Sequence, residues 1–117
     1  MKKSDYKKIL LDGCYDLAVG ETPEQNLCMR FNSEMGHNIK RQGLLKSCKD
    51  WLMGLAINIP YNNRDIVLTL GYTEQQIDAM SISKFDRLVE RYWQEMAINL
   101  SEIVTIEQKL YYKKACI

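Results

Sequence analysis

The sequence predicts an all-α protein, a compact single-domain bundle of five to six helices that spans residues 1–117. Apolar residues recur every three or four positions and almost never alternate with polar ones, which is typical of helices that bury one face. Residues that favour helix starts stand before several of these apolar runs. The chain has only two prolines and no low-complexity linker, so no sequence feature divides it into two domains.

Six helical segments follow from the apolar periodicity and the capping residues: 4–19, 23–35, 42–55, 63–70, 74–80 and 83–100. Ser4 is the expected N-cap of the first segment, and Gly13 weakens it because a mid-helix glycine costs about 1 kcal/mol against alanine. Thr22 caps the second segment, with Gln25 completing a capping box. Gly36 is expected to end that segment in a left-handed conformation.

The second half of the chain is divided by glycine and by further capping residues. Gly71 is expected to end the segment 63–70, and Thr73 opens the next one with a second capping box. Ser83 is expected to open the longest helix. Residues 101–114 can continue that helix, restart it or fray, because four of them in a row are β-branched and stiff in a helix.

The apolar stripes predict one hydrophobic core. Its expected members share the apolar faces of their helices: Leu27, Phe31, Leu52, Leu88, Tyr92 and Met96. Of the four cysteines, those at 14, 28 and 48 are expected to be small core residues, whereas Cys116 lies in the tail. If Tyr92 and Trp93 cannot both point inward, one of them is expected to mark an interface.

Composition and charge narrow the class of protein. Hydrophobic residues make up 46% of the chain and charged residues 26%, a globular balance rather than a disordered one. The net charge of +1 steers no strongly charged partner. No apolar run approaches the roughly 20 residues that cross a bilayer, and the charged start of the chain does not resemble a secretory signal. We therefore expect no membrane contact. The four cysteines have no CxxC spacing, and without a secretory signal they predict reduced thiols and a cytoplasmic location.

The segment 37–49 is the main candidate binding site, because it holds the only histidine, four basic residues and no acidic one. The candidate binding residues are His37, Lys40, Arg41, Lys46 and Lys49. Such a cluster suits a phosphate, a nucleic-acid backbone or an acidic protein patch, although a solvated helix face is the favoured interpretation of a charge run. The four cations converge only if a turn near Gly43 brings Lys40 and Arg41 beside the next helix. His37 is expected to be structural, bonded to an unpaired carbonyl at a helix end.

The residue patterns favour no catalytic, cofactor or metal site. A Cys–His nucleophilic pair needs a positioned base and an orienting group, and no such arrangement is visible in the sequence. One histidine and scattered cysteines lack the spacing of metal ligands. The carboxylate pairs Asp12/Asp16 and Asp86/Glu90 fall on expected solvent faces. No glycine-rich phosphate loop follows a strand.

Residues 65–80 fit the apolar and turn positions of a helix-turn-helix motif. The helix that would read the bases, TEQQIDAM, carries two acidic residues and no basic one, so it would repel phosphates. We therefore interpret the segment as helix–glycine–helix packing, and nucleic acid is not favoured as a partner.

Three motifs resemble those of a family of small uncharacterised bacterial and bacteriophage-borne proteins: GHNIKRQG (36–43), DWLMGL (50–55) and RYWQEMA (91–97). The family pattern runs GHNIKRxG, then DWLxGL, a short aliphatic helix and a late YW pair. The resemblance covers about residues 34–100. It implies a small helical protein of phage or mobile-element origin, and it implies no activity, cofactor or substrate.

The sequence thus favours a non-enzymatic protein-interaction module inside the cell, which binds a protein partner or itself as a homodimer. A weak nucleic-acid or phosphate-binding module that acts through residues 37–49 is the first alternative. A small enzyme with a Cys–His or carboxylate site is the second. Salt-dependent retention on heparin or DNA would favour the first alternative, and a deep pocket that holds His37 with a cysteine or carboxylate would favour the second.

Overall fold

The longest helix, α6 (Ile82–Ala115), forms the axis of the fold. The computed structural model describes residues 1–13, 22–54 and 62–115, with side chains as far as residue 111. Five shorter helices precede α6: α1 (Lys3–Asp12), α2 (Pro23–Gln42), α3 (Leu44–Gly54), α4 (Asn63–Thr69) and α5 (Glu74–Ala79). These described ranges contain no strand, so the predicted all-α fold of five to six packed helices is confirmed.

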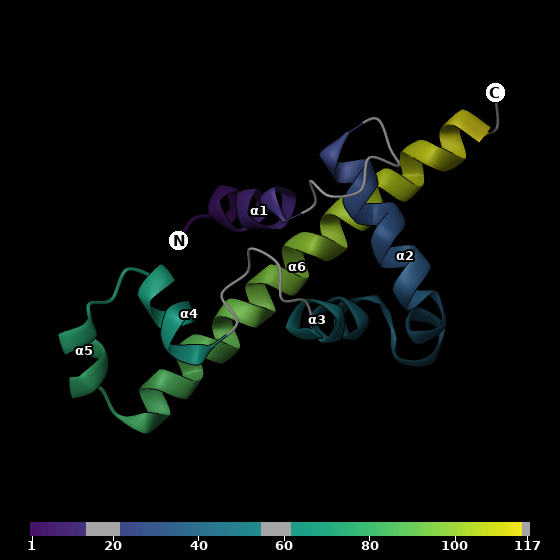
Figure 1. The fold of residues 1–117 in the computed structure, drawn as a ribbon. Helices are drawn as coiled ribbons and strands as arrows, with labels where there is room; N and C mark the ends of the chain where they lie inside the picture. The colour runs from purple at the N-terminus through teal and green to yellow at the C-terminus, as the bar shows by residue number, and fades with distance from the viewer. Residues whose placement is uncertain (14–21, 55–61, 116–117) are drawn as a thin grey trace.

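Four of the shorter helices pack directly on α6. These are α1, α2, α3 and α4, whereas α5 packs mainly on α4. Figure 1 shows α4 and α5 at the N-terminal end of α6, and α2 beside its C-terminal half. At 1.5 Å per residue a 34-residue helix is about 51 Å long, close to the 57 Å long dimension of the molecule. One helix therefore runs almost the full length of the protein.

One hydrophobic core joins α1, α2, α3, α4 and α6. Five of the six residues predicted for it are members: Leu27, Phe31, Leu52, Tyr92 and Met96. The rings of Phe31 and Trp51 meet edge to face with 5.3 Å between their centroids, a geometry that aromatic pairs favour. Trp93 is buried beside Tyr92, so both rings of this pair point inward. Cys28 and Cys48 are core residues as predicted, and Cys14 and Cys116 lie outside the described residues.

Leu88 is the predicted core residue that the core does not contain. It is half-buried and lines a hollow with Leu70 and Tyr72, where α6 meets the turn between α4 and α5. It lies one helical turn before Tyr92, on the same apolar stripe. The stripe shows which face of a helix turns inward, but the length over which other elements cover that face depends on their packing.

The first helix is shorter than predicted. It begins after Lys2, whose backbone N–H donates to the Asp5 carboxylate over 2.8 Å, so Ser4 is not the N-cap. It ends at Asp12, and the N–H of Gly13 donates to the carbonyl of Ile9. The glycine that was expected to weaken the middle of this helix therefore follows its last residue, in agreement with the low helix propensity of glycine. The rest of the predicted segment, 14–19, lies outside the described residues.

The second helix is longer than predicted. Thr22 caps it as expected, since its hydroxyl accepts the backbone N–H of Gln25 over 3.1 Å. Gly36, however, lies inside the helix, which continues to Gln42 and ends at Gly43 with φ of +92°. The reason is the apolar face, because Ile39 packs against the core one turn beyond Met35 and extends the stripe past the glycine.

The second half agrees with its predicted boundaries more closely. Gly71, with φ of +102°, separates α4 from α5, and Thr73 forms a complete capping box with Gln76. The long helix begins before Ser83, because the Ser81 hydroxyl accepts the backbone N–H of Lys84 over 3.2 Å. It then continues without a break through 101–114, which settles the three alternatives for that segment.

Two glycine substitutions in the same helix test its boundary. Gly36→Ala is expected to raise the free energy of unfolding by about 0.5–1 kcal/mol, because a helical glycine with open space around its Cα gains from a methyl group. Gly43→Ala is expected to lower it by about 1–3 kcal/mol, because only glycine adopts its backbone conformation without strain. Chemical denaturation measures both values. A loss of stability with Gly36→Ala and a gain with Gly43→Ala would instead place the helix end at Gly36.

Candidate functional site

Three of the predicted binding residues share one face of α2. His37, Lys40 and Arg41 are spaced three and four residues apart, and all three side chains are exposed. The prediction that His37 bonds a carbonyl at a helix end is wrong, because α2 continues beyond it to Gln42. The imidazole is thus a surface group beside two cations.

The other two predicted residues lie on α3, beyond the turn at Gly43. Lys46 is exposed, whereas Lys49 is half-buried and forms an ion pair with Glu90 of α6. Lys49 therefore links α3 to α6. Among the described residues, Lys40, Arg41 and Lys46 have no ion-pair partner, so their charges face solvent.

Polar contacts stabilise the turn between α2 and α3. The Gln42 side-chain amide donates to the Ser47 hydroxyl over 3.3 Å and to the Asp50 carboxylate over 2.9 Å. The buried Ser47 hydroxyl donates in turn to the carbonyl of Gly43 over 2.7 Å. These bonds fix the angle at which the basic ends of the two helices meet.

A shallow hollow surrounds His37. It has a volume of about 320 Å³, and all its lining residues belong to α2: Asn32, Ser33, Glu34, Gly36, His37 and Lys40. The absent side chain of Gly36 leaves this space open. The one carboxylate beside His37, that of Glu34, accepts a hydrogen bond from the Trp51 indole N–H and lies 3.7 Å from the Arg30 guanidinium. Glu34 thus has a structural role between α2 and α3.

The two described thiols are poor nucleophiles. Cys28 and Cys48 are both buried, and burial raises the pKa of Cys48 to about 12. Burial also raises the pKa of Cys28, helped by the charge of Glu107 and opposed by a hydrogen bond from the Asn32 amide over 3.3 Å. Cys28 lies nine residues before His37 on one helix, which separates them by about 14 Å. This distance excludes a direct pair between these two residues.

Three members of the two carboxylate pairs are on the surface. Asp12, Asp86 and Glu90 are exposed, Glu90 binds Lys49, and Asp16 lies outside the described residues. In the ranges 1–13, 22–54 and 62–115, no group of three or more His, Cys, Asp or Glu side chains could hold a metal ion.

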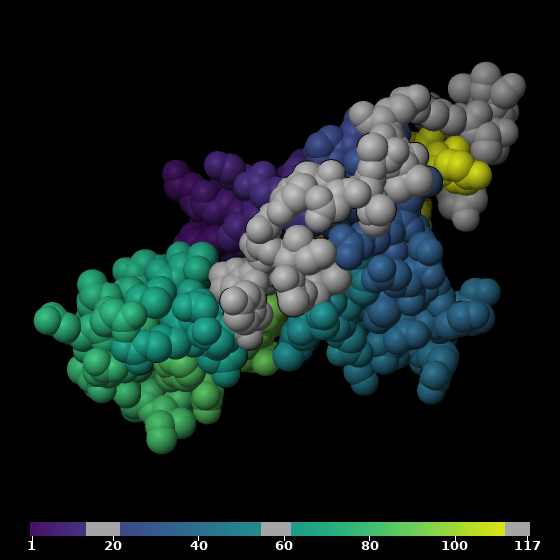
Figure 2. Space-filling model, in the orientation of Figure 1, coloured from purple at the N-terminus to yellow at the C-terminus, as the bar shows by residue number. Residues whose placement is uncertain are grey.

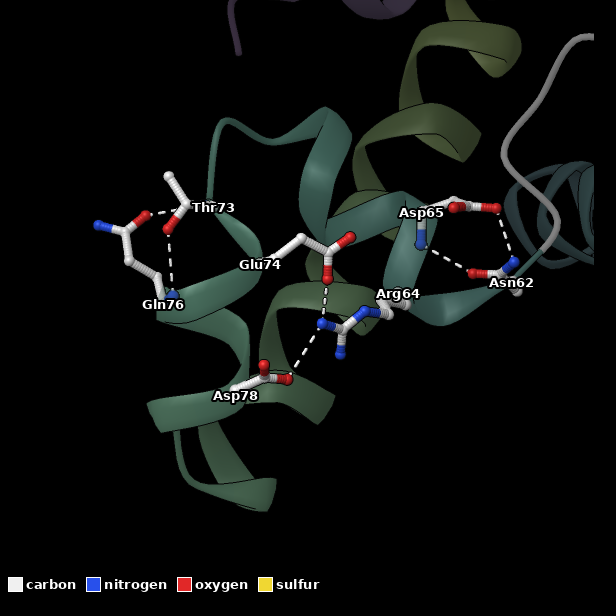
Figure 3. Close-up of polar contacts among 7 residues, drawn as sticks. All are labelled: Asn62, Arg64, Asp65, Thr73, Glu74, Gln76 and Asp78. Carbon is white, nitrogen blue, oxygen red and sulfur yellow. Dashed lines mark hydrogen bonds and ion pairs between the residues drawn. The ribbon is translucent and has the colours of Figure 1, made fainter.

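Ion pairs connect α4 and α5, the two helices of the segment that resembles a helix-turn-helix (Figure 3). Arg64 of α4 pairs with both acidic residues of α5, Glu74 and Asp78, the second over 3.0 Å. Asn62 caps α4 by accepting the N–H of Asp65 over 2.8 Å. The acidic face of α5 therefore turns toward Arg64 of α4.

A different surface, which the sequence analysis did not identify, lies at the C-terminal end of α6. There α2 and α6 form a groove of about 580 Å³, whose lining residues come from both helices: Gln25, Cys28, Met29, Asn32, Ser33, Glu107, Gln108 and Tyr111. Figure 2 shows this yellow end of α6 at the surface beside α2. Together with Leu110, which precedes Tyr111, the groove residues form what we call the α2–α6 end surface. Ile106 lines a separate hollow of α6.

Large apolar side chains are unusually exposed on the α2–α6 end surface. The exposed fractions are 48% for Met29, 47% for Leu110 and 70% for Tyr111. In contrast, Ile103 and Val104 are buried two turns earlier on α6. The apolar stripe that packs the core thus continues along α6 past the last covered turn. This continuation is visible in the sequence, but only once residues 101–114 are known to be helical.

Comparison with models of protein families, with curated proteins and with solved structures finds no match for this chain. The motif resemblance therefore stays a prediction. None of the described helices is both long and apolar enough to cross a membrane.

The thiol of Cys48 is expected to resist alkylation in the folded protein. At pH 8, a shift of its pKa from 9.0 to about 12 leaves roughly a thousandfold less thiolate than in an unfolded chain. Iodoacetamide labelling with site-by-site mass spectrometry, with and without denaturant, measures this difference. Rapid labelling of Cys48 in the native protein would contradict the buried, inert thiol.

Because the pKa of Cys48 is raised on folding, its contribution to stability is complete below pH 9 and is lost as the pH rises toward 12.

Proposed function

We propose that this protein is a non-enzymatic protein-interaction module that binds a second copy of itself through the α2–α6 end surface. The main support is that the exposed side chains of Met29 and Tyr111 line one groove, with the exposed Leu110 next to Tyr111 in the chain. Contiguous exposed apolar groups on a soluble fold mark interaction surfaces. Methionine and tyrosine are also enriched at protein interfaces.

The groove has the mixed chemistry of an interface. Its apolar floor comes from Cys28 and Met29, and its rim carries the amides of Asn32 and Gln108, which are joined by a hydrogen bond of 3.3 Å across α2 and α6. An apolar centre with a polar rim is the usual anatomy of a protein–protein contact.

The charges of the groove favour a second copy as the occupant. The lining has one charged residue, Glu107. It complements a partner segment in which a basic residue stands next to an apolar one. The end of α6 itself carries such a combination, since Lys109 stands beside the exposed Leu110. In a twofold dimer the same patch serves on both subunits, so one surface must offer both the groove and the side chains that fill it.

Other observations support a binding role over an enzymatic one. The raised pKa values of Cys28 and Cys48 remove them as nucleophiles at neutral pH. Glu34, the carboxylate nearest His37 in its hollow, is bonded to Trp51.

We propose a cytoplasmic location, because Cys28 and Cys48 are free thiols and such thiols suit a reducing compartment. A bacterial, phage or mobile-element origin is part of the same proposal and rests on the motif resemblance alone.

Substitutions on the α2–α6 end surface test the dimer. Met29→Lys and Leu110→Lys are each expected to raise the dimer dissociation constant by at least about tenfold, equivalent to about 1.4 kcal/mol, because a charge replaces a buried apolar contact. Met53→Lys is the matched control, since Met53 is 56% exposed and lies on α3. Sedimentation equilibrium across a dilution series measures the constants. A wild-type chain that stays monomeric at every concentration, or a control that weakens the dimer equally, would overturn self-association.

The exposed basic residues favour a second candidate function, binding of an acidic partner. His37, Lys40 and Arg41 form one face at the end of α2, and Lys46 lies across the turn at Gly43. The hydrogen bonds of Gln42 to Ser47 and Asp50 stabilise that turn and so keep the two groups of basic residues near each other. A fixed array of cations without ion-pair partners in the described part of the chain attracts an anionic surface.

Charge reversal tests this second candidate. Lys40→Glu with Arg41→Glu is expected to abolish wild-type retention on heparin at low salt, and that retention should fall steeply as salt screens the charges. Lys7→Glu with Lys8→Glu changes the net charge equally at exposed positions of α1, so it is the control. Equal losses in both double variants would show a net-charge effect and no site.

A further inference from the structure

A second hollow, separate from the α2–α6 end surface, lies where α1 and the turn between α4 and α5 meet α6. Its volume is about 370 Å³, and we call it the α1–α6 pocket. The side chains that give it chemical character are Lys3, Tyr6, Tyr72, Leu88, Arg91 and Glu95.

Two opposite charges stand one turn apart in this pocket. Arg91 and Glu95 have the i, i+4 spacing at which oppositely charged helical residues usually pair. Across the described residues, however, neither side chain has an ion-pair partner. Lys3 differs, because its ammonium lies 2.6 Å from the Glu102 carboxylate. The pocket therefore presents one guanidinium and one carboxylate to whatever enters it.

The exposed lining of the pocket is mostly polar, and Leu88 and two tyrosines supply its apolar contacts. Leu88 is half-buried and keeps part of its side chain open to the pocket. Tyr72 has the Lys84 ammonium 5.5 Å from its ring centroid. Tyr6 is buried, and its ring centroid lies 5.8 Å from that of Tyr92. These side chains can contact a small hydrocarbon or aromatic group.

We propose that the α1–α6 pocket binds a small zwitterion of the amino-acid type with an apolar side chain. The ligand carboxylate pairs with Arg91, its ammonium group with Glu95, and its side chain packs against Leu88 and the tyrosine rings. This site does not depend on the α2–α6 end surface, because the two share no residue.

Three probes separate the parts of this recognition. Phenylalanine carries both charges, 3-phenylpropionate lacks the ammonium group, and phenethylamine lacks the carboxylate. In two-dimensional NMR titrations of the wild-type chain, phenylalanine is expected to shift the amides around Tyr6, Tyr72 and Arg91 and to bind more tightly than the other two. No saturable shift with phenylalanine, or equal affinity for all three probes, would overturn the proposal.

Neutralising each charge assigns the two ends of the ligand. Arg91→Gln is expected to weaken the binding of phenylalanine and 3-phenylpropionate by about fivefold and to leave that of phenethylamine unchanged. Glu95→Gln is expected to weaken the binding of phenethylamine and to leave that of 3-phenylpropionate unchanged. Arg87→Gln is the matched control, because Arg87 is exposed on the same helix and does not line the pocket. Loss of binding in the control, or no selective loss in the two pocket variants, would contradict the assignment.

Discussion

The fold depends on the continuous burial of one face of α6. Taken together, the shorter helices make more contacts to α6 than to one another, although α2 also packs closely on α3 and α5 packs mainly on α4. Tyr92, Met96, Leu100 and Val104 follow one another along the buried face, and each is fully covered. Contacts from α1, α2, α3 and α4 meet along this one line of side chains. Burial of apolar area is the main stabilising force in such a domain. Most of the contacts between helices, which bury this area, involve α6.

Local chemistry explains which boundaries the sequence predicted. The limits of α4 and α5 depend on Gly71 and on the pairing of Thr73 with Gln76, and neighbours within a few residues decide both. The end of α2 could not be read in the same way, because Gly36 and Gly43 are both plausible helix ends. Burial of Ile39 decides between them, and that is a tertiary contact. Leu88 was misplaced for the same reason, since its exposure depends on where the turn after α4 lies.

The candidate sites also differ in whether neighbouring residues or tertiary contacts reveal them. The composition of residues 37–49 revealed their basic cluster. It could not reveal the ion pair between Lys49 and Glu90, because these residues lie far apart in the sequence. The α1–α6 pocket left no local signal, because Tyr6, Tyr72 and Arg91 come from three separate parts of the chain. The α2–α6 end surface is intermediate. Its α6 half follows from the helical period, which places Leu110 and Tyr111 two turns after buried residues, whereas the groove needs Met29 from α2.

The position of α6 after the helices that pack on it also constrains how the protein folds during synthesis. The Cys28 thiol meets the carbonyl of Val104, 76 residues later, and Lys49 meets Glu90, 41 residues later. The ribosome therefore releases α1, α2 and α3 before the surface on which they pack exists. Their apolar faces stay open to solvent or to chaperones until α6 emerges, because non-local contacts form only after the chain between them is complete. A truncated or stalled chain that lacks α6 would expose nearly the whole core, which makes it a natural target for aggregation or proteolysis.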